Sequence, residues 1–396
     1  MDRQEAGMKT FSRQQLWAHH SQEWREPAQI VSQWRDAGST PKSMLSAKGT
    51  PGWWEALERL GITLFVTREY EHLVIGISVL DGSPHITFLP LPHPSGLIVD
   101  RKRNHLFIAS TRNPNQVYTF RPIQPGGRRL NSFAKRRAVF LPVQTAFYPG
   151  ALYIHDLAIF GDALHANAAG QNAVVRLDAE GNFKRVWWPK CIESAHGPVF
   201  SKNHIQLNSI GGGATPRDSY YSASSCGIDR RRPGHLNYPV DRRGVIFSGK
   251  TREPICTGLT RPHSVRLSGR RIWVANSGYG ELGFVNQGKL EVVTRLPGWT
   301  RGLCIVKDII FAATSRVIPR FACYAPGLDV DASRCAVYAI CSKTGSVLGR
   351  LEWPLGNQVF AIDWIESQTS VGLPFDIRSH RTAGANALFS TFGFTG

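Results

Sequence analysis

The chain has 396 residues, of which 42% are apolar, 38 are glycine and 24 are proline. This composition excludes an intrinsically disordered chain and a coiled coil. With 47 Lys and Arg residues against 29 Asp and Glu residues, the formal net charge is +18, so we expect the surface to attract anions.

The N-terminus and the cysteines bear on the compartment in which the protein works. Residues 1–6 lack the apolar core of a secretory signal, and no apolar run approaches the roughly 20 residues needed to span a bilayer. The seven cysteines include no Cys-x-x-Cys pair and lie mostly in apolar runs, which indicates buried, reduced thiols. We therefore expect a cytoplasmic protein without a membrane span.

Residues 1–60 differ in pattern from the rest of the chain. They are polar, with tryptophans at roughly helical spacing over 14–17 and 30–34, and the segment 53–60 suits a short helix. We predict a partly helical N-terminal extension over 1–60 that packs on a larger domain.

From residue 62 onwards, short β-branched and aromatic runs alternate with Gly, Asn, Asp and Pro, which is typical of strands and turns. A four-strand unit repeats with a period of about 55 residues. Its clearest copy has expected strands at 157–160, 163–167, 173–177 and 183–187. Further copies begin near residues 97, 210, 265 and 303, so five complete units follow one another.

The two ends of this repeat region complement each other. Three strands at 63–67, 73–77 and 86–89 lack a first strand, and a lone first strand stands at 359–364. A propeller closes its ring by pairing its first and last segments, which leaves no open edge. We predict an all-β, six-bladed β-propeller over 61–366, its ring closed by N-terminal strands plus a C-terminal strand, and a C-terminal tail over 367–396. A β-sandwich would explain the strands but neither the period nor the complementary ends.

In a propeller the innermost strand of each blade lines the central channel, so equivalent positions reach the same level. Alignment of the repeats on the first apolar residue of this strand places six residues in register: Ser95, His155, Asn208, His263, Arg301 and Phe360. Imidazole ligates metals or acts as a general base, and guanidinium suits a bidentate grip on carboxylate, sulfate or phosphate. The ring predicts a site for a small anionic molecule at the channel mouth.

We assign catalytic roles to His155, His263 and Arg301. The predicted substrate-binding residues are Ser95, Asp156, Asn208, Asn276, Glu281 and Phe360. A divalent metal, its identity open, is predicted on His155, His263 and His204. The alternative for each inner His or Asp is a hydrogen-bonded structural role that links neighbouring blades.

Basic residues gather in pairs and triplets, such as 101–103 and 230–232, mostly in expected turns. Nucleic acid would be drawn to such a surface in a salt-dependent way and without specificity, because the sequence contains no recognised nucleic-acid-binding module. The expected partners are therefore a small anionic molecule or an acidic partner surface. The oligomeric state is left open.

Several motifs together resemble a bacterial family of conserved hypothetical proteins described as a domain of unknown function. These motifs are LGITLFVT at 60–67, IHDL at 154–157, HIQLN at 204–208, RPHS at 261–264, NSGYGE at 276–281 and RGL at 301–303. The resemblance covers roughly residues 50–365 and implies a six-bladed propeller, but it brings no established reaction. The family pattern has His directly before Leu-Asn, whereas Ile205 and Gln206 intervene here after His204. More distantly the chain is similar to lactonase and strictosidine-synthase-like propellers, and such a fold analogy does not fix chemistry.

Two functions remain open at this point. The first is a metal-dependent lyase, isomerase or hydrolase in which Arg301 orients an anionic substrate and a histidine moves a proton. No Ser or Cys nucleophile motif supports a hydrolase of that type. The second is a non-catalytic binding or scaffold propeller for an anionic sugar, a peptide or a partner protein. We favour the enzyme.

Overall fold

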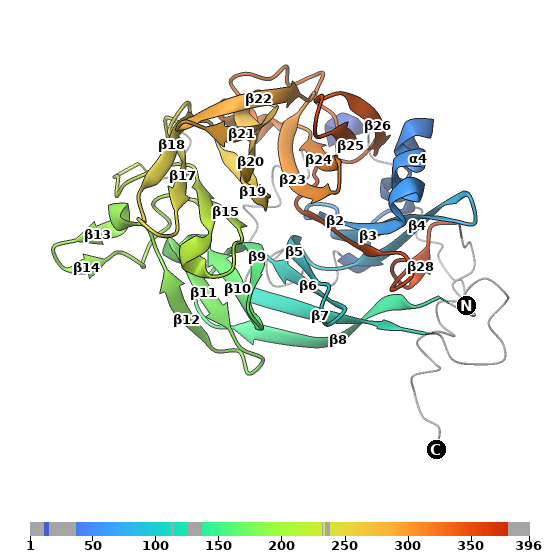
Figure 1. Cartoon of the computed structure of the whole chain (residues 1–396), viewed down its shortest axis with the longest axis horizontal. Helices are drawn as coiled ribbons and strands as arrows, with labels where there is room; N and C mark the ends of the chain where they lie inside the picture. Colours follow the sequence, from blue (N-terminus) through green and yellow to red (C-terminus); the bar gives the residue numbers. More distant parts are fainter. Residues whose placement is uncertain are drawn as a thin grey trace, which may run out of the picture.

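The computed structural model describes residues 12–15, 37–111, 115–124, 137–231, 233 and 238–378. Six antiparallel sheets surround a common centre, and each inner strand contacts the inner strands on both sides (Figure 1). The predicted six-bladed propeller is confirmed.

Five blades are each built from one continuous segment of chain. From the inner to the outer strand they are β5 (Pro94–Asp100), β6 (His105–Ser110), β7 (Asn115–Ile123) and β8 (Val139–Tyr148); β9 (Ile154–Phe160), β10 (Ala163–Ala168), β11 (Ala173–Leu177) and β12 (Phe183–Trp187); β15 (Leu207–Gly211), β16 (Tyr220–Ala223), β17 (Gly244–Ser248) and β18 (Pro254–Leu259); β19 (Pro262–Ser268), β20 (Arg271–Asn276), β21 (Glu281–Asn286) and β22 (Lys289–Arg295); β23 (Trp299–Val306), β24 (Ile309–Ser315), β25 (Ala336–Cys341) and β26 (Val347–Glu352). Inner strands such as β9 are almost wholly buried, because neighbouring blades cover both of their faces, whereas the outer strand β22 is largely exposed.

The sixth blade joins the two ends of the repeat region, as predicted. Its inner strand β27 (Ile362–Glu366) pairs with β2 (Ile62–Arg68), which continues into β3 (Leu73–Leu80) and β4 (Ser83–Pro90). Two short strands that the sequence did not predict cover outer edges: β1 (Lys48–Gly49) pairs with β26, and β28 (Phe375–Asp376) pairs with β4. The predicted boundary at residue 366 thus falls inside the closing blade.

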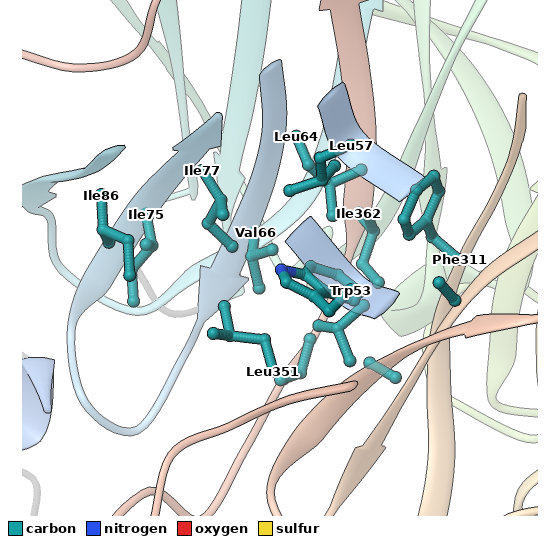
Figure 2. Packing of buried hydrophobic residues seen from close by; sticks show 14 of the residues in the cluster. Trp53, Leu57, Leu64, Val66, Ile75, Ile77, Ile86, Phe311, Leu351 and Ile362 are labelled. Atoms are coloured by element: carbon teal, nitrogen blue, oxygen red, sulfur yellow. The ribbon is translucent and has the colours of Figure 1, made fainter. Parts of the chain in front are cut away.

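Helix α4 (Pro51–Leu60) packs beside the closing blade. Proline in its first turn and Gly61 in the left-handed conformation at its end, with φ of 64°, define its bounds. The Trp53 side chain is fully buried and meets Phe311 edge to face, with ring centroids 5.5 Å apart. Figure 2 shows Trp53 among residues of both ring-closing segments, Val66 and Ile362 included. The helix therefore stabilises the joint between the first and last strands.

Replacement of Trp53 by alanine is expected to lower the free energy of unfolding by about 3–5 kcal/mol, because it leaves a large cavity at the joint. Urea unfolding followed by circular dichroism measures this loss. Glu55→Ala, an exposed change on the same helix, serves as the control and is expected to have little effect. Equal stability of the two variants would contradict the role given to the helix.

A small polar side chain links every pair of neighbouring blades. Each donates a hydrogen bond to a backbone carbonyl at or near the start of the next inner strand: Thr67 to Ser95, Ser95 to Ile154, Asn167 to Leu207, Asn208 to Pro262, Ser277 to Thr300 and Ser315 to Val359, over 2.6–3.0 Å. Because all of these donors are buried, their loss would leave unpaired polar groups between blades.

The remaining elements are short. They are the hairpin β13 (Glu193–Ser194) and β14 (Gly197–Pro198), and the 3-10 helices η1 (Lys42–Leu45), η3 (Ala169–Gln171), η4 (Lys190–Ile192), η5 (Pro216–Asp218), η6 (Ser277–Tyr279) and η7 (Pro319–Tyr324). The helical stretch expected at 30–34 and most of that at 14–17 lie outside the described residues. In the part of the chain that the structure describes, no helix is both long and apolar enough to cross a membrane. All seven cysteines are free; Cys226 and Cys323 are exposed, so the expectation of buried thiols is wrong for these two.

Candidate functional site

A cavity of about 370 Å³ lies at the end of the channel where the inner strands begin. Its walls come from the starts of β9, β19 and β23, from the segment before β27, and from the loops that follow β2 and β24. The side chains of His155, His263, Arg301 and Phe360 also line a void of about 10 Å³, room for about one water molecule. Since these four side chains line both spaces, they form the floor of the cavity.

A second tier of side chains stands two residues before the predicted ring. Residues two positions apart in a strand point to the same side, so this tier continues the wall of the cavity upwards. Its members at the cavity are Tyr153, Gln206, Arg261, Trp299 and Gln358. Tyr153, Gln206 and Arg261 have φ values of 50–54°, a left-handed conformation that is uncommon outside glycine and that functional sites often retain.

The cavity holds an excess of buried N–H donors. The side chains of Arg261 and Arg316 are at least nine-tenths buried, with exposures of 8% and 7%. Among the residues that the structure describes, no acceptor meets Nε and Nη1 of Arg261, Nε and Nη1 of Arg316, Nε of Arg301 or Nε1 of Trp299. Buried polar groups are normally hydrogen-bonded, so this set of donors indicates a missing acceptor-rich occupant.

Each guanidinium group is nevertheless held in place. Arg301 lies over the Phe360 ring, 3.3 Å from its centroid, and Arg261 lies 4.7 Å from the centroid of Tyr324. Nη2 of Arg316 donates to the Pro354 carbonyl over 2.6 Å. These contacts orient the cations without neutralising them, which is the preorganisation that a binding site requires.

Glu69 is the one carboxylate that lines the cavity within the described part of the chain. The Gln358 amide, oriented to satisfy both neighbours, accepts from Nη1 of Arg301 over 3.3 Å and donates to Oε2 of Glu69 over 3.2 Å. Glu69 also accepts from the hydroxyl of Thr111. One carboxylate against three guanidinium groups leaves the cavity with a net positive charge.

Burial opposes the charge of all three arginines. It lowers the pKa of Arg301 to about 10, and it lowers the pKa of Arg261 and of Arg316. At neutral pH all three remain cations, because even a pKa near 10 lies well above 7. The lowered pKa values show that the protein itself provides too little negative charge at this place.

His263 is held as a neutral base beside these cations. Burial first, and then Arg301, Arg261 and His155, lower its pKa well below 6.5. Its Nδ1 lies 2.7 Å from the Arg261 carbonyl, which only accepts, so Nδ1 carries the proton and Nε2 keeps the lone pair. His155 has Nε2 within 3.4 Å of the Gln206 amide. The floor therefore combines a neutral base with a fixed cation.

Beyond the floor the channel is balanced in charge. Asp156 accepts from Nη1 of Arg266 and from the Ile210 backbone amide, both over 3.0 Å. Although burial opposes it, Asp156 raises the pKa of Arg266. Asp363 pairs with Arg101 in the same manner. These paired groups tie blades together, so the excess of cations is confined to the cavity.

The structure brings together four of the predicted site residues, and these are His155, His263, Arg301 and Phe360. Ser95 and Asn208 instead spend their hydrogen bonds on the neighbouring blade. Asn276 binds the Thr260 amide and Glu281, and Glu281 in turn pairs with Arg295, so both brace a turn. Asp156, Asn208 and Arg266 reach only the small void beneath the floor.

The predicted metal ligands do not assemble into a metal site. His204 is absent from the lining of the cavity, and its backbone amide binds Asn172. No group of three or more His, Cys, Asp or Glu side chains suited to a metal occurs among the described residues. Three guanidinium groups would also repel a divalent cation, so the residues present do not fit this cofactor.

Sequence reasoning missed the second tier and the two loops. The second tier had a signal, since the alignment that gave the ring would have given Tyr153, Arg261 and Trp299 if read two residues upstream. Glu69 and Arg316 follow second strands and carry no repeat signal, because only the folded loops bring them to the axis.

Comparisons with known proteins give a family and a fold. A family model described as Domain of unknown function (DUF4915) matches residues 51–372. No curated protein matches the chain. The structure of a nidogen/laminin complex is similar at 8% identity and a TM-score of 0.52, over 78% of this chain and 100% of the other. A gluconolactonase from Xanthomonas campestris has 13% identity and a TM-score of 0.43, over 74% and 86%. A putative 6-phosphogluconolactonase from Bacteroides uniformis has 12% identity and a TM-score of 0.44, over 77% and 99%.

Proposed function

Because the chain belongs to the DUF4915 family, whose description names no activity, we propose a function from the cavity alone: it binds a small organic anion at the channel mouth. The observation that supports this is the set of buried, acceptor-free N–H groups on Arg261, Arg301, Arg316 and Trp299. Guanidinium groups pair with carboxylate, sulfate or phosphate through parallel hydrogen bonds. Aromatic walls at Tyr153 and Phe360 suit an apolar body on the same ligand.

The anion site supports either turnover or binding without turnover. His263 supplies a neutral base within the same cavity, and a guanidinium beside it stabilises negative charge that develops on a substrate, as a lyase, isomerase or hydrolase requires. The alternative is a binding propeller that releases its ligand unchanged. Product analysis of a bound anion after prolonged incubation separates the two, since His263→Asn is expected to abolish turnover while it preserves binding.

Titration calorimetry with inorganic phosphate, sulfate and benzoate tests the binding itself. We expect saturable binding of at least one of these anions, and a loss of about tenfold or more in affinity for Arg301→Met, because a charge-assisted hydrogen bond is removed. The exposed Arg295→Met is the matched control and is expected to leave affinity unchanged. Absence of binding by all three anions, or equal affinity in both variants, would refute the proposal.

Anion binding is expected to take up protons below pH 6.5. In the free protein the pKa of His263 is lowered by burial and by Arg301 and Arg261. A bound anion offsets the two cations and so raises this pKa, and protons enter between the free and bound values. Affinity should therefore rise as pH falls from 7.5 to 6. Calorimetry in buffers of different ionisation enthalpy measures the uptake, which His263→Asn is expected to remove.

A further inference from the structure

The three cavity arginines occupy two different levels of the wall. Arg301 lies on the inner strand β23 and belongs to the floor, whereas Arg316 follows the second strand β24 and lines only the main cavity. Trp299 pairs with Ser315 across the two strands. Arg301 lies two residues inward from this pair and Arg316 one residue outward, so their backbones are about three strand steps, roughly 10 Å, apart along the axis.

The surroundings of the two arginines also differ. Arg301 and Arg261 act on each other and on His263, so they form one electrostatic centre at the floor. Arg316 is anchored elsewhere, with its amide on the Asn357 carbonyl over 2.7 Å and its Nη2 on the Pro354 carbonyl. The groups that act on its charge include Arg13, Glu352 and Glu71, and neither Arg301 nor Arg261 is among the chief ones.

The surface between the two centres is largely aromatic. Trp299 meets Phe321 at 5.5 Å and Tyr324 at 6.3 Å between ring centroids, and all three side chains line the cavity. Glu71, the nearest buried carboxylate on that side of the chain, is committed to Arg68 and to the backbone amides of Asn357 and Gln358. Arg316 thus keeps two buried N–H groups that no described acceptor meets.

We propose that Arg316 forms a second anion subsite, and that the ligand carries two separated anionic groups joined by an apolar body. One group binds Arg301 and Arg261 at the floor, and the other binds Nε and Nη1 of Arg316 near the mouth. This proposal rests on the proposed function, because it names the class of anion that the same cavity selects. A cavity of about 370 Å³ has room for a molecule of this kind.

Paired carboxylates of equal length test the second subsite. Succinate, adipate and suberate are compared by calorimetry with butanoate, hexanoate and octanoate, in the full chain and in Arg316→Met. We expect at least one dicarboxylate to bind about tenfold or more tightly than its monocarboxylate partner. Arg316→Met is expected to remove this gap while it leaves monocarboxylate affinity unchanged, and Arg316→Lys should restore part of the gap because it restores the charge.

The outcomes separate this proposal from the function on which it rests. Arg334→Met, an exposed change on the same connection, controls for general charge loss. If monocarboxylates or phosphate bind in an Arg301-dependent way but no dicarboxylate gap appears, the second subsite is refuted and the anion site stands. A gap that persists in Arg316→Met, or an equal loss for both ligand types, refutes it as well. If no anion binds at all, both proposals fail.

Discussion

Replacement of Arg261 by methionine is expected to stabilise the ligand-free protein, by about 1–4 kcal/mol, while it weakens anion binding about tenfold or more. Arg261 is 92% buried by its 8% exposure, its Nε and Nη1 meet no described acceptor, and burial lowers its pKa. An apolar side chain of similar length removes an uncompensated charge and keeps the contact with Tyr324. Functional sites often retain such destabilising groups.

Thermal and urea unfolding in anion-free buffer, with calorimetry for binding, measure both halves of this expectation. Arg266→Met is the matched control, because Arg266 lies on the same strand but is paired with Asp156. That change leaves a buried carboxylate without its partner and is expected to destabilise by about 3–5 kcal/mol. If Arg261→Met destabilised the protein as much as Arg266→Met, the cavity would not hold an unpaired cation.

Loss of Asp156 is the second large expected effect. Its carboxylate accepts from the Ile210 amide of the next blade and from Arg266 one blade further, so it joins three blades. Asp156→Ala leaves the Arg266 cation and a backbone amide unpaired in a buried position. We expect a loss of about 3–5 kcal/mol in the free energy of unfolding, and a smaller loss for Asp156→Asn, which keeps an acceptor.

Urea unfolding of purified variants measures this loss. Asp162→Ala provides the comparison, since Asp162 pairs with Arg103 at the exposed rim, where its side chain is 65% accessible. A surface ion pair contributes about 0–1 kcal/mol, so its removal is expected to change little. Similar stability of the two variants would show that Asp156 does not hold the blades together.

A bound anion would reverse the balance at the cavity. Without ligand, Arg261, Arg301 and Arg316 oppose folding through the cost of burying their charges. A ligand that neutralises them stabilises the folded state in proportion to RT ln(1 + [L]/Kd). The melting temperature of the protein is therefore expected to depend on anion concentration more strongly than that of Arg261→Met.

Part of the site could be derived from the repeat. Alignment of the inner strands placed His155, His263, Arg301 and Phe360 at one level, and these four form the cavity floor. The same alignment placed Ser95 and Asn208 there, yet both bind carbonyls of the neighbouring blade. The repeat register fixes height in the channel. Whether a polar side chain faces the axis or the next blade depends on contacts between blades.

The sequence by itself determined the six blades, the pairing of the first and last strands that closes the ring, and the position of the floor. These features follow from strand alternation and from a period that is repeated along the chain, and both are local properties. Only the tertiary structure decided that Arg316 and Glu69 reach the axis, that Arg261 lacks an acceptor while Arg266 has one, and that His204 lies away from His155. The reason is that loop paths and ion pairs between blades join residues far apart in sequence, and no periodic pattern encodes such pairings.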